Sequence, residues 1–196
     1  TPPHPAQAAL RLEQLARAAI AEEEFHLRVT TFAKQDIKLD VRSDDDGPLR
    51  VLAAGVADRR FLALSNALTA AGVEVVAAPT PYTAFDYLHE SPFDAAVLWG
   101  AEDHAPALSI AAGMKRNTRL YHIPLMLYLR GKNEISLSEL FNRGFADVAS
   151  ADTPEGETAE RILALAGAHR THLGIRKPLD SVRSLELLDP ATGLFT

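Results

Sequence analysis

The feature that most constrains the fold is a regular alternation of short apolar runs and longer amphipathic stretches after Gly47 and Pro48. Five apolar runs predict strands, at residues 49–54, 73–77, 93–99, 123–129 and 145–149. Five helical patterns alternate with them, at residues 58–71, 81–89, 106–117, 135–142 and 154–170. Strands that are apolar throughout and are each followed by a helix are typical of a parallel sheet covered on both faces. Right-handed crossovers then favour an α/β, doubly wound, five-stranded sheet of the flavodoxin type, in the order 2-1-3-4-5.

The segments on either side of this region have a different character. Residues 5–32 carry apolar side chains at helical spacing and contain no glycine, which predicts one long added N-terminal helix. The sequence SDDDGP at 43–48 is a turn and boundary signal. We therefore expect an N-terminal helix and linker at 1–48, an α/β domain at 49–172, and a linker helix leading into a further domain at 173–196.

Composition excludes several classes of protein. The 196 residues include no cysteine, so disulfides, thiolate catalysis and zinc–thiolate sites are excluded. A net charge of -6 argues against nucleic acid as the main partner, because binding phosphates needs a surface rich in Lys and Arg. No apolar run approaches the ~20 residues of a membrane span, and the first residues lack a signal peptide. We expect a cytoplasmic chain without a membrane partner, and its start without methionine suggests a piece of something longer.

Four segments, at 49–52, 93–98, 123–127 and 144–148, resemble the strand-centred motifs of response-regulator receiver domains in order and spacing. The resemblance covers about two thirds of the chain. It implies a known chemistry, in which an acid pair ending the first strand and an aspartate ending the third hold Mg²⁺. The aspartate takes up a phosphoryl group, which a Thr or Ser after the fourth strand and a Lys after the fifth then contact.

In this sequence the matching positions carry inert side chains. The acid pair falls at Gly55 and Val56, or one residue earlier, and the nucleophile position, counted from Asp94, falls at Trp99. The hydroxyl position falls at Leu129 and the lysine position at Ala151. None of these side chains can attack phosphorus or hold Mg²⁺. The resemblance therefore implies a degenerate receiver, or pseudo-receiver, with no catalytic residue, no metal and no cofactor.

Both ends of the chain extend the resemblance. The sequence DPATGLF at 189–195 resembles the opening of GGDEF domains, the diguanylate cyclase fold, although Ala191 replaces the usual Leu. The opening helix resembles the last helix of a preceding receiver. Together these features resemble tandem receiver–GGDEF regulators of the PleD/PopA type, in which receiver and GGDEF domains are neighbours.

The main functional hypothesis is a non-phosphorylatable pseudo-receiver that serves as a dimerisation or partner-docking module in bacterial cyclic di-GMP signalling, and is not itself an enzyme. One alternative is the regulatory part of an active diguanylate cyclase. Another is a receiver-like sensor that binds a ligand such as cyclic di-GMP. For a homodimer or a protein partner we expect an aromatic and apolar surface around the fourth and fifth strands, formed by Tyr128, Leu137, Leu140, Phe141 and Phe145.

Other polar groups favour simpler interpretations. Glu102, Asp103 and His104 could hold a metal at the carboxyl end of the sheet, but no acid on the first strand completes the set, so a polar loop is favoured. The aspartates at 44–46 precede the first strand and belong at its opposite end. Exposed side chains without a ligand are also favoured for the pair His169 and His172, for the Arg-x-x-Asp pattern at 42–45, and for the cations Arg59, Arg60, Arg130 and Lys132.

Overall fold

The computed structural model describes residues 5–33, 47–100, 104–130 and 135–183. The chain divides into two compact units. One comprises Thr1–Arg11 and Gly47–His169, and the other comprises Leu12–Asp46 and Arg170–Thr196. The two long helices, α1 (Pro5–Ala33) and α6 (Glu155–Arg183), each contribute residues to both units.

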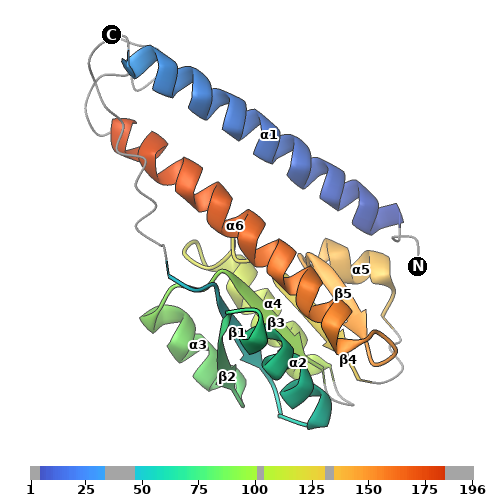
Figure 1. Cartoon of the computed structure of the whole chain (residues 1–196). Coiled ribbons are helices and arrows are strands. Elements are labelled where there is room, and N and C mark those ends of the chain that lie inside the picture. Colours follow the sequence, from blue (N-terminus) through green and yellow to red (C-terminus); the bar gives the residue numbers. More distant parts are fainter. Residues whose placement is uncertain (1–4, 34–46, 101–103, 131–134, 184–196) are drawn as a thin grey trace. The chain divides into compact units, whose positions relative to one another are not determined.

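The first unit contains a parallel sheet of five strands in the order β2-β1-β3-β4-β5 (Figure 1). The pairing is in register from strand to strand, with Val51 of β1 opposite Val75 of β2 and Ala95 of β3. This order confirms the topology predicted from the alternating pattern. The strands are β1 (Arg50–Ala54), β2 (Glu74–Ala78), β3 (Ala95–Trp99), β4 (Leu125–Leu129) and β5 (Asp147–Ser150).

Four shorter helices alternate with the strands: α2 (Arg59–Ala70), α3 (Pro81–Glu90), α4 (Ala105–Arg116) and α5 (Leu137–Asn142). Three of them begin at a side chain that caps the first turn. Asp58, Thr80 and Ser136 each accept a hydrogen bond from the backbone N–H three residues later. Such caps satisfy otherwise unpaired donors and place the start of each helix just after its strand or loop.

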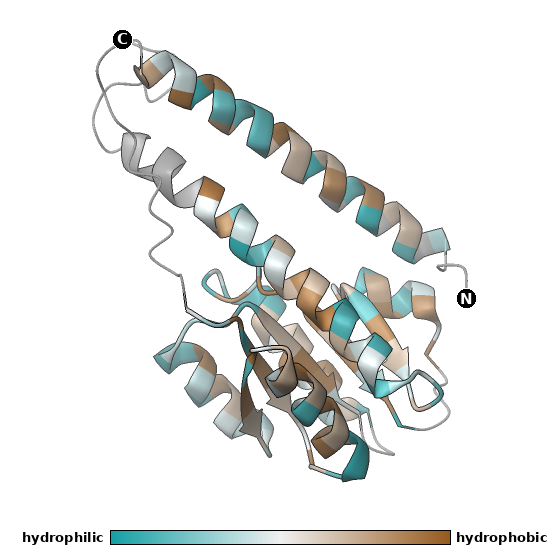
Figure 2. Cartoon of the chain, viewed as in Figure 1, coloured by the Kyte–Doolittle hydropathy of each residue, from teal (hydrophilic) through white to brown (hydrophobic). Residues whose placement is uncertain are grey.

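The core lies in two layers, one on each face of the sheet. Side chains alternate along each strand, so that Leu52, Leu98 and Leu127 face α3, α4 and α5. Their neighbours Val97 and Met126 face α2 and the first half of α6. Figure 2 shows the sheet as the most hydrophobic part of the first unit. Burial on both faces explains why the strands read as continuous apolar runs.

Helix α6 differs from the sequence-based prediction, which ended it near Arg170. The helix continues through Gly174 and Pro178 to Arg183, and so absorbs the first part of the separate helical pattern expected there. A glycine inside a helix costs only about 1 kcal/mol relative to alanine, which weakens a helix without ending it. The N-terminal helix predicted for 5–32 is confirmed as α1.

The first two turns of α1 belong to the first unit and contact the start of β5. Asp147 is fully buried there, and its carboxylate accepts hydrogen bonds from the Gln7 amide and from Arg11, whose Nη2 lies 3.1 Å away. Arg161 of α6 completes the cluster, with its Nε 2.8 Å from the carboxylate and its Nη2 donating to the Val148 carbonyl. A buried carboxylate with this many charged and polar donors is fully paired, and it ties α1, β5 and α6 together.

Candidate functional site

The carboxyl end of the sheet is the place where ligands of doubly wound folds bind, and four of the five positions singled out in the sequence are joined there in two pairs, Gly55 with Trp99 and Leu129 with Ala151. Gly55 follows β1 and lies directly against Trp99, the last residue of β3. A Cβ atom at Gly55 would fall 2.6 Å from the Cβ of Trp99 and 2.7 Å from its carbonyl oxygen. The backbone of Gly55 also has φ +140, a conformation that only glycine adopts readily. No acidic side chain fits at position 55 beside this tryptophan.

The indole of Trp99 occupies the centre of an aromatic cluster. It stacks on Tyr128 of β4 with ring centroids 3.9 Å apart and an interplanar angle of 2°. It also meets Phe61 of α2 edge to face, at a centroid distance of 5.5 Å and an angle of 84°. All three rings are at most 4% exposed. The Trp99 side chain is therefore part of the core between the sheet and α2.

The other three positions singled out in the sequence are Leu129, Ala151 and Val56, and none of them has a reactive side chain. Leu129 is buried on the opposite face of the sheet, against α3, α4 and α5. Ala151 donates its N–H to the Leu129 carbonyl at 3.0 Å, and its own carbonyl accepts a hydrogen bond from Arg60. Val56 is 64% exposed and points away from the core. The structure thus brings Gly55 and Trp99 into contact, joins Leu129 to Ala151, and leaves Val56 in solvent.

Two of the cations considered as an anion site have acidic partners. The Nε of Arg130 lies 2.8 Å from the Asp58 carboxylate, and Nη1 of Arg60 lies 3.6 Å from that of Glu155. The Tyr128 hydroxyl beside it, and then Glu155, raise the pKa of Arg60, so this guanidinium stays charged. Lys132 lies outside the described residues. Among the described residues at this edge, the exposed Arg59 is therefore the one cation left that could contact a nucleotide phosphate.

His104 stands at the start of α4 without capping it through its side chain. Its ring covers Gly100, where a Cβ atom would lie 2.8 Å from Nδ1. Within the described ranges neither ring nitrogen has a hydrogen-bond partner. Glu102 and Asp103, its companions in the considered metal site, lie outside these ranges, as do the aspartates at 44–46. Among the residues that the structure does describe, no three His, Asp or Glu side chains form a group that could hold a metal ion.

The surface expected for a partner is mostly core. Tyr128, Leu140 and Phe145 are fully buried and Phe141 is 7% exposed, so these four side chains cannot be presented to another protein. Only Leu137, at 39%, faces solvent. The physical reason is that Leu140 and Phe145, from the short α5 and the turn after it, are needed for the core on one face of the sheet, while Tyr128 belongs to the core on the other face. The expectation of two exposed histidines also needs correction, since His169 is 8% exposed and stacks on His122, whereas His172 is exposed.

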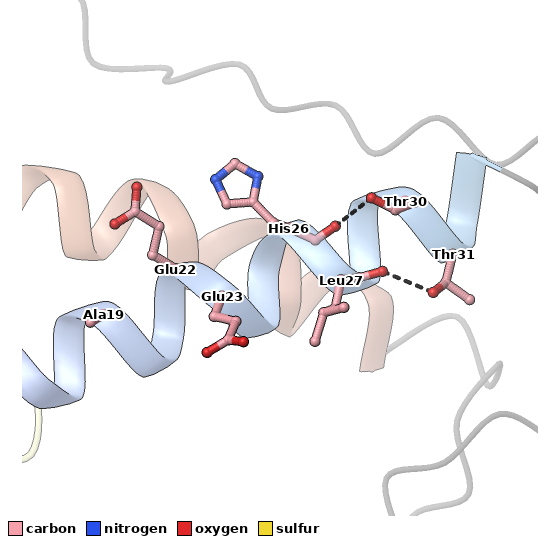
Figure 3. Close-up of a pocket in the computed structure, with 7 residues that line it drawn as sticks. All are labelled: Ala19, Glu22, Glu23, His26, Leu27, Thr30 and Thr31. Carbon is pink, nitrogen blue, oxygen red and sulfur yellow. Dashed lines mark hydrogen bonds between the residues drawn. The ribbon is translucent and has the colours of Figure 1, made fainter.

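A hollow of about 560 Å³ lies on α1 and was not anticipated from the sequence. The described residues that line it all belong to α1: Ala19, Glu22, Glu23, His26, Leu27, Thr30 and Thr31 (Figure 3). The two threonine hydroxyls donate to the His26 and Leu27 carbonyls one turn earlier, at 2.8 Å each. Both hydroxyls are thus engaged with the helix that carries them.

The cluster around Asp147 was not predicted from the sequence either, although an aspartate at the start of an apolar run was a visible signal.

Comparison with known proteins relates the first unit to solved receiver structures. A candidate response regulator from Chloroflexus aurantiacus J-10-fl is similar at 16% identity and a TM-score of 0.55, over 61% of this chain and 98% of that one. The receiver domain of a histidine kinase from Syntrophus aciditrophicus has 14% identity and a TM-score of 0.53, over 60% and 89% of the two chains. The chemotaxis response regulator CheY4 of Vibrio cholerae is similar at 16% identity and a TM-score of 0.52, over 61% of this chain and 98% of that one.

These likenesses show that the chain has the receiver fold. No family model matches the sequence, and no curated protein does either. In the described ranges, no helix has the length and apolar character needed to span a membrane. The segment at 189–195 that resembles a GGDEF opening lies outside the described residues.

Proposed function

We propose that this chain is a non-phosphorylatable pseudo-receiver, a cytoplasmic regulatory module of bacterial cyclic di-GMP signalling that acts through protein contacts. The observation that carries the proposal is the packing of Trp99 against Phe61 and Tyr128, with Gly55 against its backbone. A receiver with this core has the scaffold that transmits a signal and no group that takes up phosphate.

The chemistry of phosphoryl transfer sharpens this proposal. Uptake of phosphate by a receiver needs a carboxylate nucleophile and Mg²⁺, which requires several oxygen ligands. The positions after β1 and at the end of β3 carry Gly55, Val56 and Trp99. With no oxygen ligand from these three side chains, the positions themselves offer acetyl phosphate neither a nucleophile nor a metal ligand. We expect the module to be in one signalling state regardless of phosphate donors.

The direct test is incubation with acetyl phosphate and Mg²⁺, followed by intact mass measurement. We expect no phosphoryl adduct, while a receiver with its acid pair and aspartate intact is modified under the same conditions. A stable adduct on this chain would overturn the proposal. The Trp99→Asp variant belongs in the same experiment, because a carboxylate alone at this position, without the acid pair, is also expected to stay unmodified.

The contact role is tested by sedimentation equilibrium over a wide concentration range, with and without Mg²⁺ and beryllofluoride. We expect a homodimer whose stability does not depend on the phosphoryl mimic. Leu137→Asp removes the one solvent-facing residue of the predicted surface and should weaken that dimer. Leu62→Asp is the matched control, since Leu62 is 56% exposed on α2. A dimer that forms only with beryllofluoride would contradict the inert site, and a monomer in all conditions would leave docking of a different protein as the contact role.

A further inference from the structure

One stretch of this acidic chain carries only positive charge. The chain has 26 Asp and Glu residues against 20 Lys and Arg, yet residues 105–130 include Lys115, Arg116, Arg119 and Arg130 and no acid. Lys115 and Arg116 lie in the last turn of α4, where a cation offsets the partial negative charge of a helix end. The helix end accounts for the position of these two cations, but not for the hollow beside them.

This hollow has a volume of about 270 Å³ and lies between α4 and the residues that follow α5. Its floor is apolar, with Ala111 and Phe145 buried in the core of the sheet. Its rim is cationic, and Arg143 at the end of α5 contributes to it as α4 does. We call it the α4–α5 hollow, and it is lined by Leu108, Ala111, Ala112, Lys115, Arg116, Arg143 and Phe145.

The two cations from α4 are held in place, and each keeps hydrogen-bond donors. Nζ of Lys115 donates to the carbonyls of Tyr121 at 2.9 Å and Ile123 at 3.4 Å, which leaves the third N–H of the ammonium group. Nε of Arg116 donates to the Ala112 carbonyl at 3.2 Å. Among the described residues, its two Nη groups have no acceptor. The rim therefore offers N–H donors that the fold itself does not use.

The third cation, Arg143, has an acidic partner on its own helix. Its Nε and Nη2 donate to one carboxylate oxygen of Glu139, at 3.2 Å and 2.7 Å. Both side chains are about half exposed, and ion pairs in solvent contribute little. Within the described ranges, no ion pair joins Lys115 or Arg116 to an acid. The hollow thus keeps a surplus of positive charge, with three cations against one carboxylate.

The chemistry and size of the hollow decide what fits it. Charged N–H donors form their strongest hydrogen bonds with carboxylates and phosphates, and the apolar floor favours an apolar group. The volume of about 270 Å³ falls just below the ~300–1,000 Å³ of small-molecule pockets, which is little room for a dinucleotide. It suits one large side chain of a protein. A central apolar anchor surrounded by polar contacts is also how few residues supply most of the binding energy of an interface.

We propose that the α4–α5 hollow docks an acidic segment of a partner protein. One large apolar side chain of that segment enters the hollow, and neighbouring carboxylates contact Lys115, Arg116 and Arg143. The inference rests on the contact role proposed above and gives it a partner of stated chemistry. The surface is separate from the one expected around Leu137, which lies at the opposite end of α5 and does not line the hollow.

The test measures the binding of fluorescein-labelled peptides to this chain by fluorescence anisotropy. The probes are three short peptides of Asp and Glu with one central Leu, Phe or Trp, and a fourth peptide with Ala at the centre. We expect at least one of the three to bind, and the Ala peptide to bind at least about tenfold more weakly. Affinity should fall as salt is added. Binding by none of the three would overturn the proposal, and so would equal binding of the Ala peptide, because charge alone would then explain it.

Three variants locate the bound peptide. Arg116→Glu should raise its Kd by roughly tenfold, because the change removes an attraction and adds a repulsion of similar size. Arg119→Glu is the matched control: Arg119 is an exposed cation of the same stretch that does not line the hollow, so Kd should change by less than about threefold. Ala112→Leu fills the hollow without a change of charge and should weaken binding by at least about tenfold. Equal effects of the two arginine variants, or an unchanged Kd in Ala112→Leu, would overturn the proposal.

These results are independent of the phosphorylation test. A phosphoryl adduct together with intact peptide binding would contradict the pseudo-receiver and leave the docking site standing. Failure of the peptides to bind, without an adduct, would contradict the docking site alone.

Discussion

The indole ring of Trp99 lies parallel to the phenol ring of Tyr128, with their centroids 3.9 Å apart. Trp99 ends β3, Tyr128 is the residue before the last of β4, and the two are paired in register. If Trp99 stands at the nucleophile position of receivers, as we propose, this stacking makes that position part of the core. The consequences for stability and chemistry can be measured.

Replacement of Trp99 by Asp should destabilise the protein without creating a receiver. The variant loses two aromatic contacts, leaves a cavity and buries a charge, so we expect the free energy of unfolding to fall by about 4 kcal/mol or more. Urea denaturation followed by circular dichroism measures the change. Tyr82→Asp is the control, because Tyr82 is 77% exposed and should change stability by less than about 0.5 kcal/mol. Similar losses in both variants would contradict the buried position of Trp99.

Gly55→Ala should destabilise the protein by about 2 kcal/mol or more, since the methyl group meets Trp99 and the backbone has φ +140. Because the clash is with the Cβ and carbonyl of Trp99, adding Trp99→Ala should give no rescue. Gly156→Ala is the matched control: nothing lies within 4 Å of its added methyl group, so it should raise stability by about 0.5 kcal/mol. A neutral Gly55→Ala variant would show that Trp99 and Gly55 are not in contact.

Asp147→Ala should lower the free energy of unfolding by about 3–5 kcal/mol, because the Arg161 guanidinium and the Gln7 amide lose their buried acceptor. Hydrogen exchange should also accelerate in the first two turns of α1, which the carboxylate holds. Arg11→Ala removes a partner whose side chain is 45% exposed, and we expect a cost of only about 1 kcal/mol. Unchanged exchange in residues 5–11 of the Asp147→Ala variant would mean that the cluster does not hold α1.

The buried position of Lys115 should make the stability of the protein depend on pH in the alkaline range. Its stem lies across Gly144 and its ammonium donates to the Tyr121 carbonyl at 2.9 Å, while burial lowers its pKa below the ordinary 10.5. Between the lowered folded pKa and 10.5 the unfolded chain binds more protons, so stability should rise with pH in this window. Denaturation at a series of pH values measures the slope. Lys115→Met should reduce it, and a slope that persists unchanged in this variant would assign it to other groups.

Much of the fold followed from local pattern. The alternation of strands and helices, the parallel order 2-1-3-4-5 and the long first helix were all readable, because apolar periodicity and capping residues such as Asp58 and Ser136 act over a few positions. The end of α6 was misjudged, since a glycine weakens a helix by an amount that neighbouring turns can offset.

In the candidate site, too, some properties could be predicted from the sequence and others depended on the tertiary structure. Residue identity alone showed that Gly55 and Trp99 cannot perform phosphoryl chemistry. Only the tertiary structure decided that Trp99 stacks on Tyr128, that Phe145 is core and not surface, and that Gln7 meets Asp147 across 140 residues of sequence. A local pattern sets which element forms, but which side chains are buried depends on what each element packs against, and that is a property of the assembled layers.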